Sequence, residues 1–213
     1  MNTKSGSGSP EAMDNRTRPI DGATPVNDLS GLKLPPSKTY TLQEIYEAEA
    51  RNIANATLKY LSAPPTKKEA SFSFAWMLQL HREMFAEVWE WAGMLRHSEL
   101  SIGVKAYLVP TELKKLCDDI AYWEEHQSFD LTETAARIHH RAVQIHPFLN
   151  GNGRWARMLA NIYLRQHHEM PVKWQEELLA QENPGRERYI RALKSADEGD
   201  YAAFIELHRI RYP

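Results

Sequence analysis

Residues 146–157 read HPFLNGNGRWAR, a short polar and glycine-rich stretch. It lies between two segments with helical hydrophobic periodicity, Leu131 to Ile145 and about Gly153 to His168. Pro147 cannot continue the first helix, because its ring removes a backbone donor and restricts the residue before it. The expected local structure is therefore a helix, a tight polar loop and a second helix.

This loop has the composition of an anion site with a base beside it. Gly151 and Gly153 carry no side chain, so backbone N–H groups can approach a ligand, and the start of the next helix adds unpaired donors and a positive dipole end. Arg154 and Arg157 are one helical turn apart, and their guanidinium groups match phosphate geometry. His146 at the rim could accept a proton near neutral pH.

The flanking sequence predicts a mainly α fold. Helical periodicity and a stop at the Pro64-Pro65 pair predict a helix from Leu42 to Leu61, with Thr41 as its N-cap. Similar patterns predict four more helices, at Ser71 to Trp91, Thr111 to His126, Glu187 to Ala196 and Tyr201 to Arg211. Arg96 to Val109 differs, because its β-compatible residues and the bend available at Gly103 predict a short hairpin.

The 213-residue length favours one domain with extensions. Residues 1–36 are rich in Ser, Gly, Pro, Asn and Thr and predict a flexible arm, part of it compatible with an expression tag, so the domain is assigned to residues 37–213. The net charge of −2 offers no broad attraction to nucleic acid or to an anionic membrane. No apolar run is long enough to cross a bilayer and no secretory signal is evident, which predicts a cytoplasmic protein. The single Cys117 is expected to be a packed thiol.

The loop sequence resembles the signature of the Fic family, His-x-Phe-x-(Asp or Glu)-Gly-Asn-Gly-Arg-x-x-Arg. Every fixed position is met except the acidic one, where Asn150 stands. The resemblance extends to LHREMF at residues 80–85, WEWAG at 89–93 and ADEGDY at 196–201, and so covers most of the chain after about Thr41. The Asn variant is similar to a Fic subgroup called mobile mystery protein B. This likeness implies a Fic-like helical bundle with a small β-hairpin flap.

The resemblance also implies an activity: a Mg²⁺-dependent nucleotidyltransferase that moves AMP from ATP to a Ser, Thr or Tyr hydroxyl of a target protein. His146 would be the general base, and Arg154 and Arg157 would hold the β and γ phosphates. The hairpin would be a flap that docks a target segment as an added strand. The implied nucleotide-binding residues are Asn150, Gly151, Asn152, Gly153, Arg154 and Arg157, and the implied docking residues are Ile102, Gly103 and Val104.

Asn150 is the departure that leaves other functions open. The family's acidic residue binds Mg²⁺, and a neutral amide oxygen at this position should bind the ion more weakly. Transfer of another phosphate-linked group is one alternative, and a weakly active Fic protein that binds a nucleotide or a partner is a second. A metal cluster of His139, His140 and His146 is disfavoured, because adjacent helical residues point in different directions and no carboxylate or cysteine completes the ligand set.

Regulation is expected to differ from that of many Fic proteins. In those relatives a helix with Ser or Thr, three arbitrary residues, Glu, then Gly or Asn places the Glu on the motif's last arginine. No stretch here fits, so we expect that Arg157 is not blocked by such a motif. The resemblance instead implies a small regulatory partner protein, and an association with bacterial toxins or delivered effectors.

Overall fold

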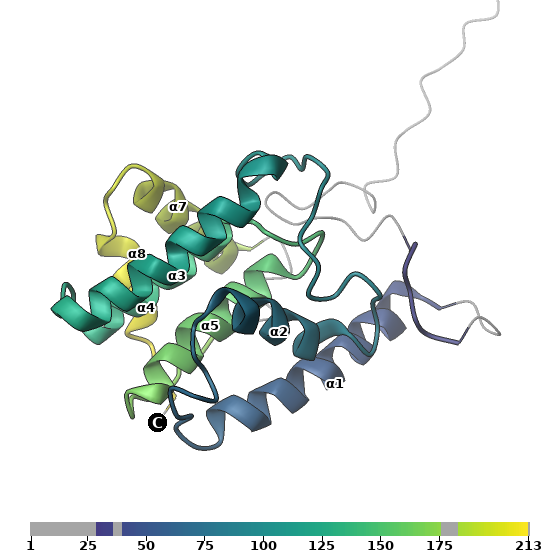
Figure 1. The fold of residues 1–213 in the computed structure, drawn as a ribbon, viewed down its shortest axis with the longest axis horizontal. Coiled ribbons are helices and arrows are strands. Elements are labelled where there is room, and N and C mark those ends of the chain that lie inside the picture. The colour runs from purple at the N-terminus through teal and green to yellow at the C-terminus, as the bar shows by residue number, and fades with distance from the viewer. Residues whose placement is uncertain (1–28, 36–39, 176–182, 213) are drawn as a thin grey trace, which may run out of the picture.

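The computed structural model describes residues 29–35, 40–175 and 183–212 (Figure 1). Within these ranges the regular secondary structure is almost entirely helical. The α-helices are α1 (Leu42–Leu61), α2 (Phe74–Phe85), α3 (Val109–His126), α4 (Leu131–Ile145), α5 (Asn152–Gln166), α7 (Pro184–Asp197) and α8 (Ala202–His208). A short 3-10 helix, η2 (Ala106–Leu108), leads directly into α3. No helix in the described ranges is both long and apolar enough to cross a membrane.

Local sequence signals explain where several helices begin. The Thr41 side chain accepts a hydrogen bond from the Glu44 N–H, and the Glu44 side chain accepts one from the Thr41 backbone, so α1 starts with a complete capping box. The side chains of Ser73 and Asp130 cap α2 and α4 by accepting hydrogen bonds from the Trp76 and Glu133 N–H groups, respectively. The predicted bounds of α1 and α4 are confirmed, since the apolar periodicity and the caps agree there.

The core is organised around α4 and α5, which pack against each other and are joined by the polar loop (Figure 1). α5 is buried on nearly all sides from Trp155 to Leu164, as expected for a central helix. α1 and α2 cover α5, and α3 packs on α4. A second apolar cluster, including Ala136, Tyr189 and Phe204, attaches α7 and α8 to α4. The loop is therefore held between two helices fixed by the whole domain.

The hairpin prediction for Arg96 to Val109 is wrong. Residues 96–105 form bends and irregular backbone, and the strand-like pairings in the described chain are two isolated bridges, Leu32 with Trp89 and Val172 with Arg211. The Arg96 side chain donates to the carbonyls of Ser98 and Val104, which would otherwise be acceptors in a ladder. Side-chain bonding has replaced strand pairing across this segment.

The described end of the N-terminal arm also differs from prediction. Residues 29–34 lie against the turn after α2: the Glu90 N–H donates to the Gly31 carbonyl, and Leu32 and Leu34 pack on the core. The contact falls on the turn that replaces the predicted end of α2, which stops at Phe85 instead of continuing to Trp91. The remaining arm prediction, for residues 1–28, lies outside the described residues.

Candidate active site

The loop from His146 to Gly151 is held in shape by its own side chains. The Asn152 side chain accepts a hydrogen bond from the Phe148 N–H at 2.9 Å and donates to the Phe148 carbonyl at 2.8 Å. Phe148 is fully buried and stacks on His81 with 3.6 Å between ring centroids. Gly151 has a φ of 77°, and a Cβ there would lie 2.6 Å from Phe85, so only glycine fits.

His81 braces the same loop from α2. Its Nδ1 accepts a hydrogen bond from the Gly93 N–H, and its Nε2 lies 3.1 Å from the Asn150 carbonyl. Because a carbonyl can only accept, the proton must be on Nε2. Burial lowers the pKa of His81 to about 3, so the ring is neutral. His81 is therefore a packing and bracing residue, as expected for a helix-packing histidine.

His146 is the C-cap of α4 and has a left-handed backbone, with φ 53° and ψ 61°. Its Nδ1 lies 3.3 Å from the Val143 carbonyl, which places the proton on Nδ1 and the lone pair on Nε2. Nε2 makes no hydrogen bond with the part of the chain that the structure describes. Burial, helped by the charge of Arg96, lowers the pKa of His146 to about 4. At neutral pH the ring is an unprotonated base.

The two arginines of the loop occupy different environments. Arg154 is partly exposed and donates to the carboxylate of Glu49 at 2.6 Å. Glu49 itself is fully buried on α1, and its other oxygen accepts from Trp89 Nε1 at 2.6 Å. Arg157 is buried, and its Nη1 would lie 3.3 Å from a Cβ placed on Gly153. Arg157 therefore lies against the first turn of α5, where the helix presents its backbone donors.

Residues 102–104, predicted to dock a target segment, lie beside His146 although they are not a strand. The Val104 N–H donates to the Ile145 carbonyl at 3.4 Å. Gly103 has a φ of 100°, and a Cβ there would lie 2.6 Å from the His146 Cβ. The segment thus passes directly over the candidate base.

A comparison with family models identifies the architecture. Residues 71–164 match the model described as the Fic/DOC family. The chain carries a Fic/DOC domain. The predicted mainly α fold is confirmed, and the motif that carries the resemblance lies within the matched residues.

Known relatives agree with this family. A protein adenylyltransferase Fic from Aedes aegypti is 29% identical over 155 residues, which cover 71% of this chain and 30% of the relative. The chain therefore spans about a third of that relative's length. Fic-1 (residues 134–508) from C. elegans has a TM-score of 0.63 at 26% identity, with 83% of this chain and 51% of that one covered. The N-terminal Fic domain of a cell filamentation protein from Bartonella quintana, solved with bound ADP, has a TM-score of 0.60 at 21% identity, covering 83% and 89%.

Asn150 offers the Fic domain little for a resident metal. Its side-chain oxygen accepts a hydrogen bond from the Gly151 N–H at 2.6 Å, and its backbone carbonyl faces His81. Among the described residues no group of three or more His, Cys, Asp or Glu side chains could hold an ion. His139 and His140 are engaged in hydrogen bonds with His208 and Asp197, respectively.

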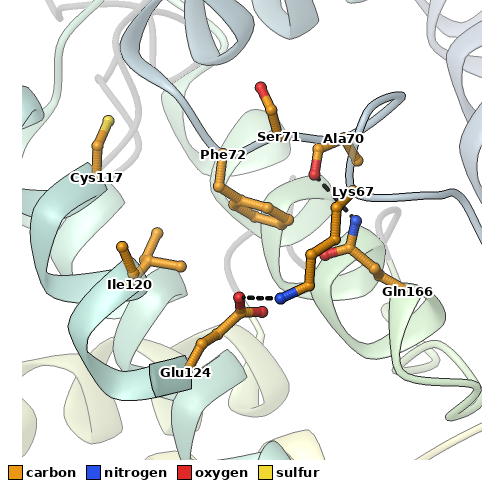
Figure 2. Close-up of a pocket in the computed structure, with 9 residues that line it drawn as sticks. Lys67, Ala70, Ser71, Phe72, Cys117, Ile120, Glu124 and Gln166 are labelled. Atoms are coloured by element: carbon orange, nitrogen blue, oxygen red, sulfur yellow. Dashed lines mark hydrogen bonds and ion pairs between the residues drawn. The ribbon is translucent and has the colours of Figure 1, made fainter. Parts of the chain in front are cut away.

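One hollow of the Fic domain lies away from the motif. Figure 2 shows this hollow, of about 70 Å³, lined by Cys117, Phe72, Glu124 and Gln166. Gln166 is at the far end of α5 from the loop, roughly 20 Å away at 1.5 Å per residue. This hollow is too small for a nucleotide. The packed thiol expected from the sequence is confirmed, because Cys117 is buried, and burial raises its pKa to about 11.

Two residues of the site were missed by the sequence analysis. Glu49 is one charge among several on α1, and only its burial against Trp89 distinguishes it. Arg96 was considered only as the start of a hairpin. The available signal was its position soon after the WEWAG stretch, which carries the family resemblance.

Proposed function

We propose that this chain is a protein adenylyltransferase that transfers AMP from ATP to a Ser, Thr or Tyr hydroxyl of a target protein. The observation that carries the proposal is the lone pair on His146 Nε2. It belongs to a neutral imidazole whose other nitrogen is fixed on the Val143 carbonyl, and the loop that follows His146 leads directly to the N-terminus of α5 with its two arginines. The name of the Aedes aegypti relative supports the same activity.

The transfer step uses His146 as the base. The target hydroxyl oxygen attacks the α-phosphorus, and its proton passes to His146 Nε2. A new bond forms between that oxygen and the α-phosphorus while the bond to the oxygen bridging the α and β phosphates breaks. Pyrophosphate leaves with the electron pair, and negative charge grows on its oxygens. His146 then returns the proton to solvent.

The start of α5 would hold the phosphates. Gly151 and Gly153 leave the backbone N–H groups approachable, while the side chain of Asn152 is already engaged with Phe148. A phosphate contact from Asn152 would therefore come from its backbone. Arg154 and Arg157 would stabilise the charge that develops on pyrophosphate. Arg154 forms an ion pair with Glu49, so this arginine is oriented before the nucleotide arrives.

The metal would enter with the substrate. Mg²⁺ keeps several waters and is commonly held by one or two carboxylates together with substrate phosphates. Asn150 supplies a single neutral oxygen, so the ATP phosphates would provide most of the ligands, and Mg²⁺ is best regarded as part of the ATP substrate. This substitution favours slow turnover, and it keeps transfer of another phosphate-linked group as the second candidate.

The macromolecular partner would be a target protein docked along residues 102–104. Because this segment is bent, a target strand would pair with only part of it before reaching His146. A small regulatory partner, a cytoplasmic location and an effector role are further proposals that rest on the family. The domain assignment of residues 37–213 and the expectation that Arg157 is not blocked by an inhibitory motif both stay predictions.

The test is transfer of label from ATP. The protein is incubated with ATP labelled on the α-phosphate, Mg²⁺ and cell lysate, in parallel with His146→Ala and with Arg51→Ala, an exposed arginine on α1. Protein labelling that His146→Ala abolishes and Arg51→Ala retains supports the proposal. Labelling only from other nucleotide-linked donors favours the second candidate. Nucleotide binding without transfer from any donor refutes enzymatic activity.

A further inference from the structure

Arg96 is a buried arginine whose hydrogen bonds go to backbone carbonyls. Only 2% of the residue is exposed. Its Nε donates to the His146 carbonyl at 2.6 Å, and its Nη2 donates to the carbonyls of Val104 at 2.5 Å and Ile145 at 3.5 Å. Its Nη1 donates to the Ser98 carbonyl at 2.9 Å, and its backbone N–H donates to the Pro147 carbonyl at 2.9 Å.

These acceptors come from two segments that must be aligned in the proposed reaction. The carbonyls of Ile145 and His146 belong to the end of α4 and the start of the loop. The carbonyls of Ser98 and Val104 belong to the segment that passes over the base. A cation at this position also suits the negative end of the α4 dipole and satisfies C-terminal carbonyls that have no partner within the helix.

The charge of Arg96 receives little compensation from acidic side chains. The acidic side chain that acts on it electrostatically is Glu99, whose Oε1 accepts a hydrogen bond from the Ala106 N–H. A buried arginine is costly unless its donors are satisfied. Because carbonyls satisfy them here, removing Arg96 would release several carbonyls on both segments at once.

We propose that Arg96 is the positioning residue of this active site, which holds the His146 backbone in its left-handed conformation and fastens residues 98–104 to it. The base and the segment that would dock a target thereby form one rigid unit. Gly103 fits the same geometry, because a Cβ there would lie 2.9 Å from Arg96 Nη2 and 2.6 Å from the His146 Cβ. The catalytic part of this inference rests on the proposed function.

An effect on the His146 titration follows from the same arrangement. After burial, the charge of Arg96 is the cause that lowers the pKa of His146, while the hydrogen bond to Val143 raises it. Charged groups on the neighbouring elements are Glu99 and Lys105 on the overlying segment, Arg154 and Arg157 on α5, and Arg141 on α4. Titratable His81 on α2 is neutral. Replacing Arg96 by a neutral residue removes the nearby cation, so the His146 pKa should rise towards its ordinary value of 6.5.

The experiment measures the His146 ring by NMR as a function of pH, with the signal assigned by its loss in His146→Ala. It compares the wild type with Arg96→Met, which removes the charge, and Arg96→Lys, which keeps the charge but loses the planar set of donors. Arg51→Met, at an exposed arginine on α1, is the matched control. The rate of AMP transfer is measured on the same proteins from pH 8 down through the pH at which the wild-type His146 titrates.

The expected results separate the effect of the Arg96 charge from the effect of its hydrogen-bond geometry. Arg96→Met should titrate His146 at a higher pH and lose about tenfold or more in kcat, with the acid limb of kcat/KM moved upward. Arg96→Lys should keep the wild-type titration and still lose kcat. If Arg96→Met does not fold, the kcat of Arg96→Lys decides the geometric role.

The proposal is overturned if the folded variants keep both the wild-type titration and the wild-type kcat. It is also overturned if Arg51→Met moves the His146 titration as far as Arg96→Met does. A wild type without any transfer activity would refute the proposed function. In that case the His146 titration in the Arg96 variants decides whether Arg96 affects the environment of the His146 ring.

Discussion

Two groups of buried histidines in this molecule look alike in sequence and behave differently in structure. His139 and His208 lie between α4, α7 and α8, and His146 ends α4 at the loop. His208 Nδ1 donates to the Phe204 carbonyl, His208 Nε2 accepts from His139 Nδ1, and His139 Nε2 accepts from the Tyr189 hydroxyl. Every ring nitrogen in that chain has a partner. In His146 one nitrogen is fixed and the other keeps its lone pair.

The difference shows that burial and a lowered pKa do not by themselves identify a catalytic histidine. Burial lowers the pKa of His208 to about 4 and lowers that of His139 well below its ordinary value, as it does for His146. The feature that supports His146 as the proposed base is the unshared lone pair on its Nε2. The other two histidines serve the attachment of the C-terminal helices.

The largest expected effect comes from replacing the base. His146→Ala should lower the rate of AMP transfer by about 10²–10⁴-fold, because proton removal from the target hydroxyl loses its acceptor. ATP affinity, measured by calorimetry, should change little, because the phosphates are held by α5. An active His146→Ala would place the base elsewhere.

Acid should weaken the fold through the buried histidines. His139, His146 and His208 have folded pKa values below the unfolded value of 6.5, so the unfolded chain binds more protons in this range. Stability present above pH 6.5 is therefore lost as pH falls from 6.5 towards about 4, by roughly 1.4 kcal/mol per pH unit for each proton. Urea unfolding at several pH values would measure this slope.

The matched variant for the acid effect is His208→Phe, which removes one of these groups. Its slope should be flatter by about one proton equivalent. The carboxylates with lowered pKa, such as Glu112 and Glu124, start from 4.5 and so contribute only at the acid end of this window, which is why the slopes are compared between pH 7 and 5. A wild-type stability that does not change between pH 7 and 5 would contradict the neutral assignment of the buried rings.

Replacing His139 should show that this histidine has a structural role, in contrast to the role proposed for His146. His139→Phe should cost about 2–4 kcal/mol of unfolding free energy, because it leaves Tyr189 and His208 without their partner. Transfer activity measured well below the melting temperature should stay near wild type. A large loss of kcat without a loss of stability would assign His139 a role in the chemistry.

The smallest effect is expected from a pair of glycines. Gly103→Ala and Gly199→Ala both place a side chain at positive φ, which costs about 1 kcal/mol. A Cβ at Gly199 would have nothing within 4 Å, whereas one at Gly103 would meet His146. Only Gly103→Ala should therefore lose activity, by about tenfold. Equal activity in the two variants would show that residues 102–104 do not constrain the base.

The sequence predicted those parts of the fold where local and global signals agree. α1 and α4 were bounded correctly because an N-cap, amphipathic spacing and a clear stop coincide at each. The loop was located by Pro147 and two glycines. Its side-chain contacts were not predictable, because the partners of Arg154 and His81 lie 105 and 69 residues away in the chain.

The failures have a common physical cause. The hairpin was predicted from β-compatible residues, but one buried arginine binds the carbonyls that a ladder would have used. α2 was predicted to extend to Trp91, but residues after Phe85 form a turn that pairs with residues 29–34. In both cases a long-range contact outweighed a local preference, and single-sequence patterns do not report such contacts.

The reciprocal bonds between Asn152 and Phe148 have a kinetic consequence. They close the loop through contacts internal to the protein, so the proposed phosphate site would already be shaped when a nucleotide arrives. Little ordering entropy should then be lost on association. Nucleotide capture observed by stopped flow should show a single phase whose observed rate rises linearly with concentration, without the plateau that a slow loop rearrangement would impose.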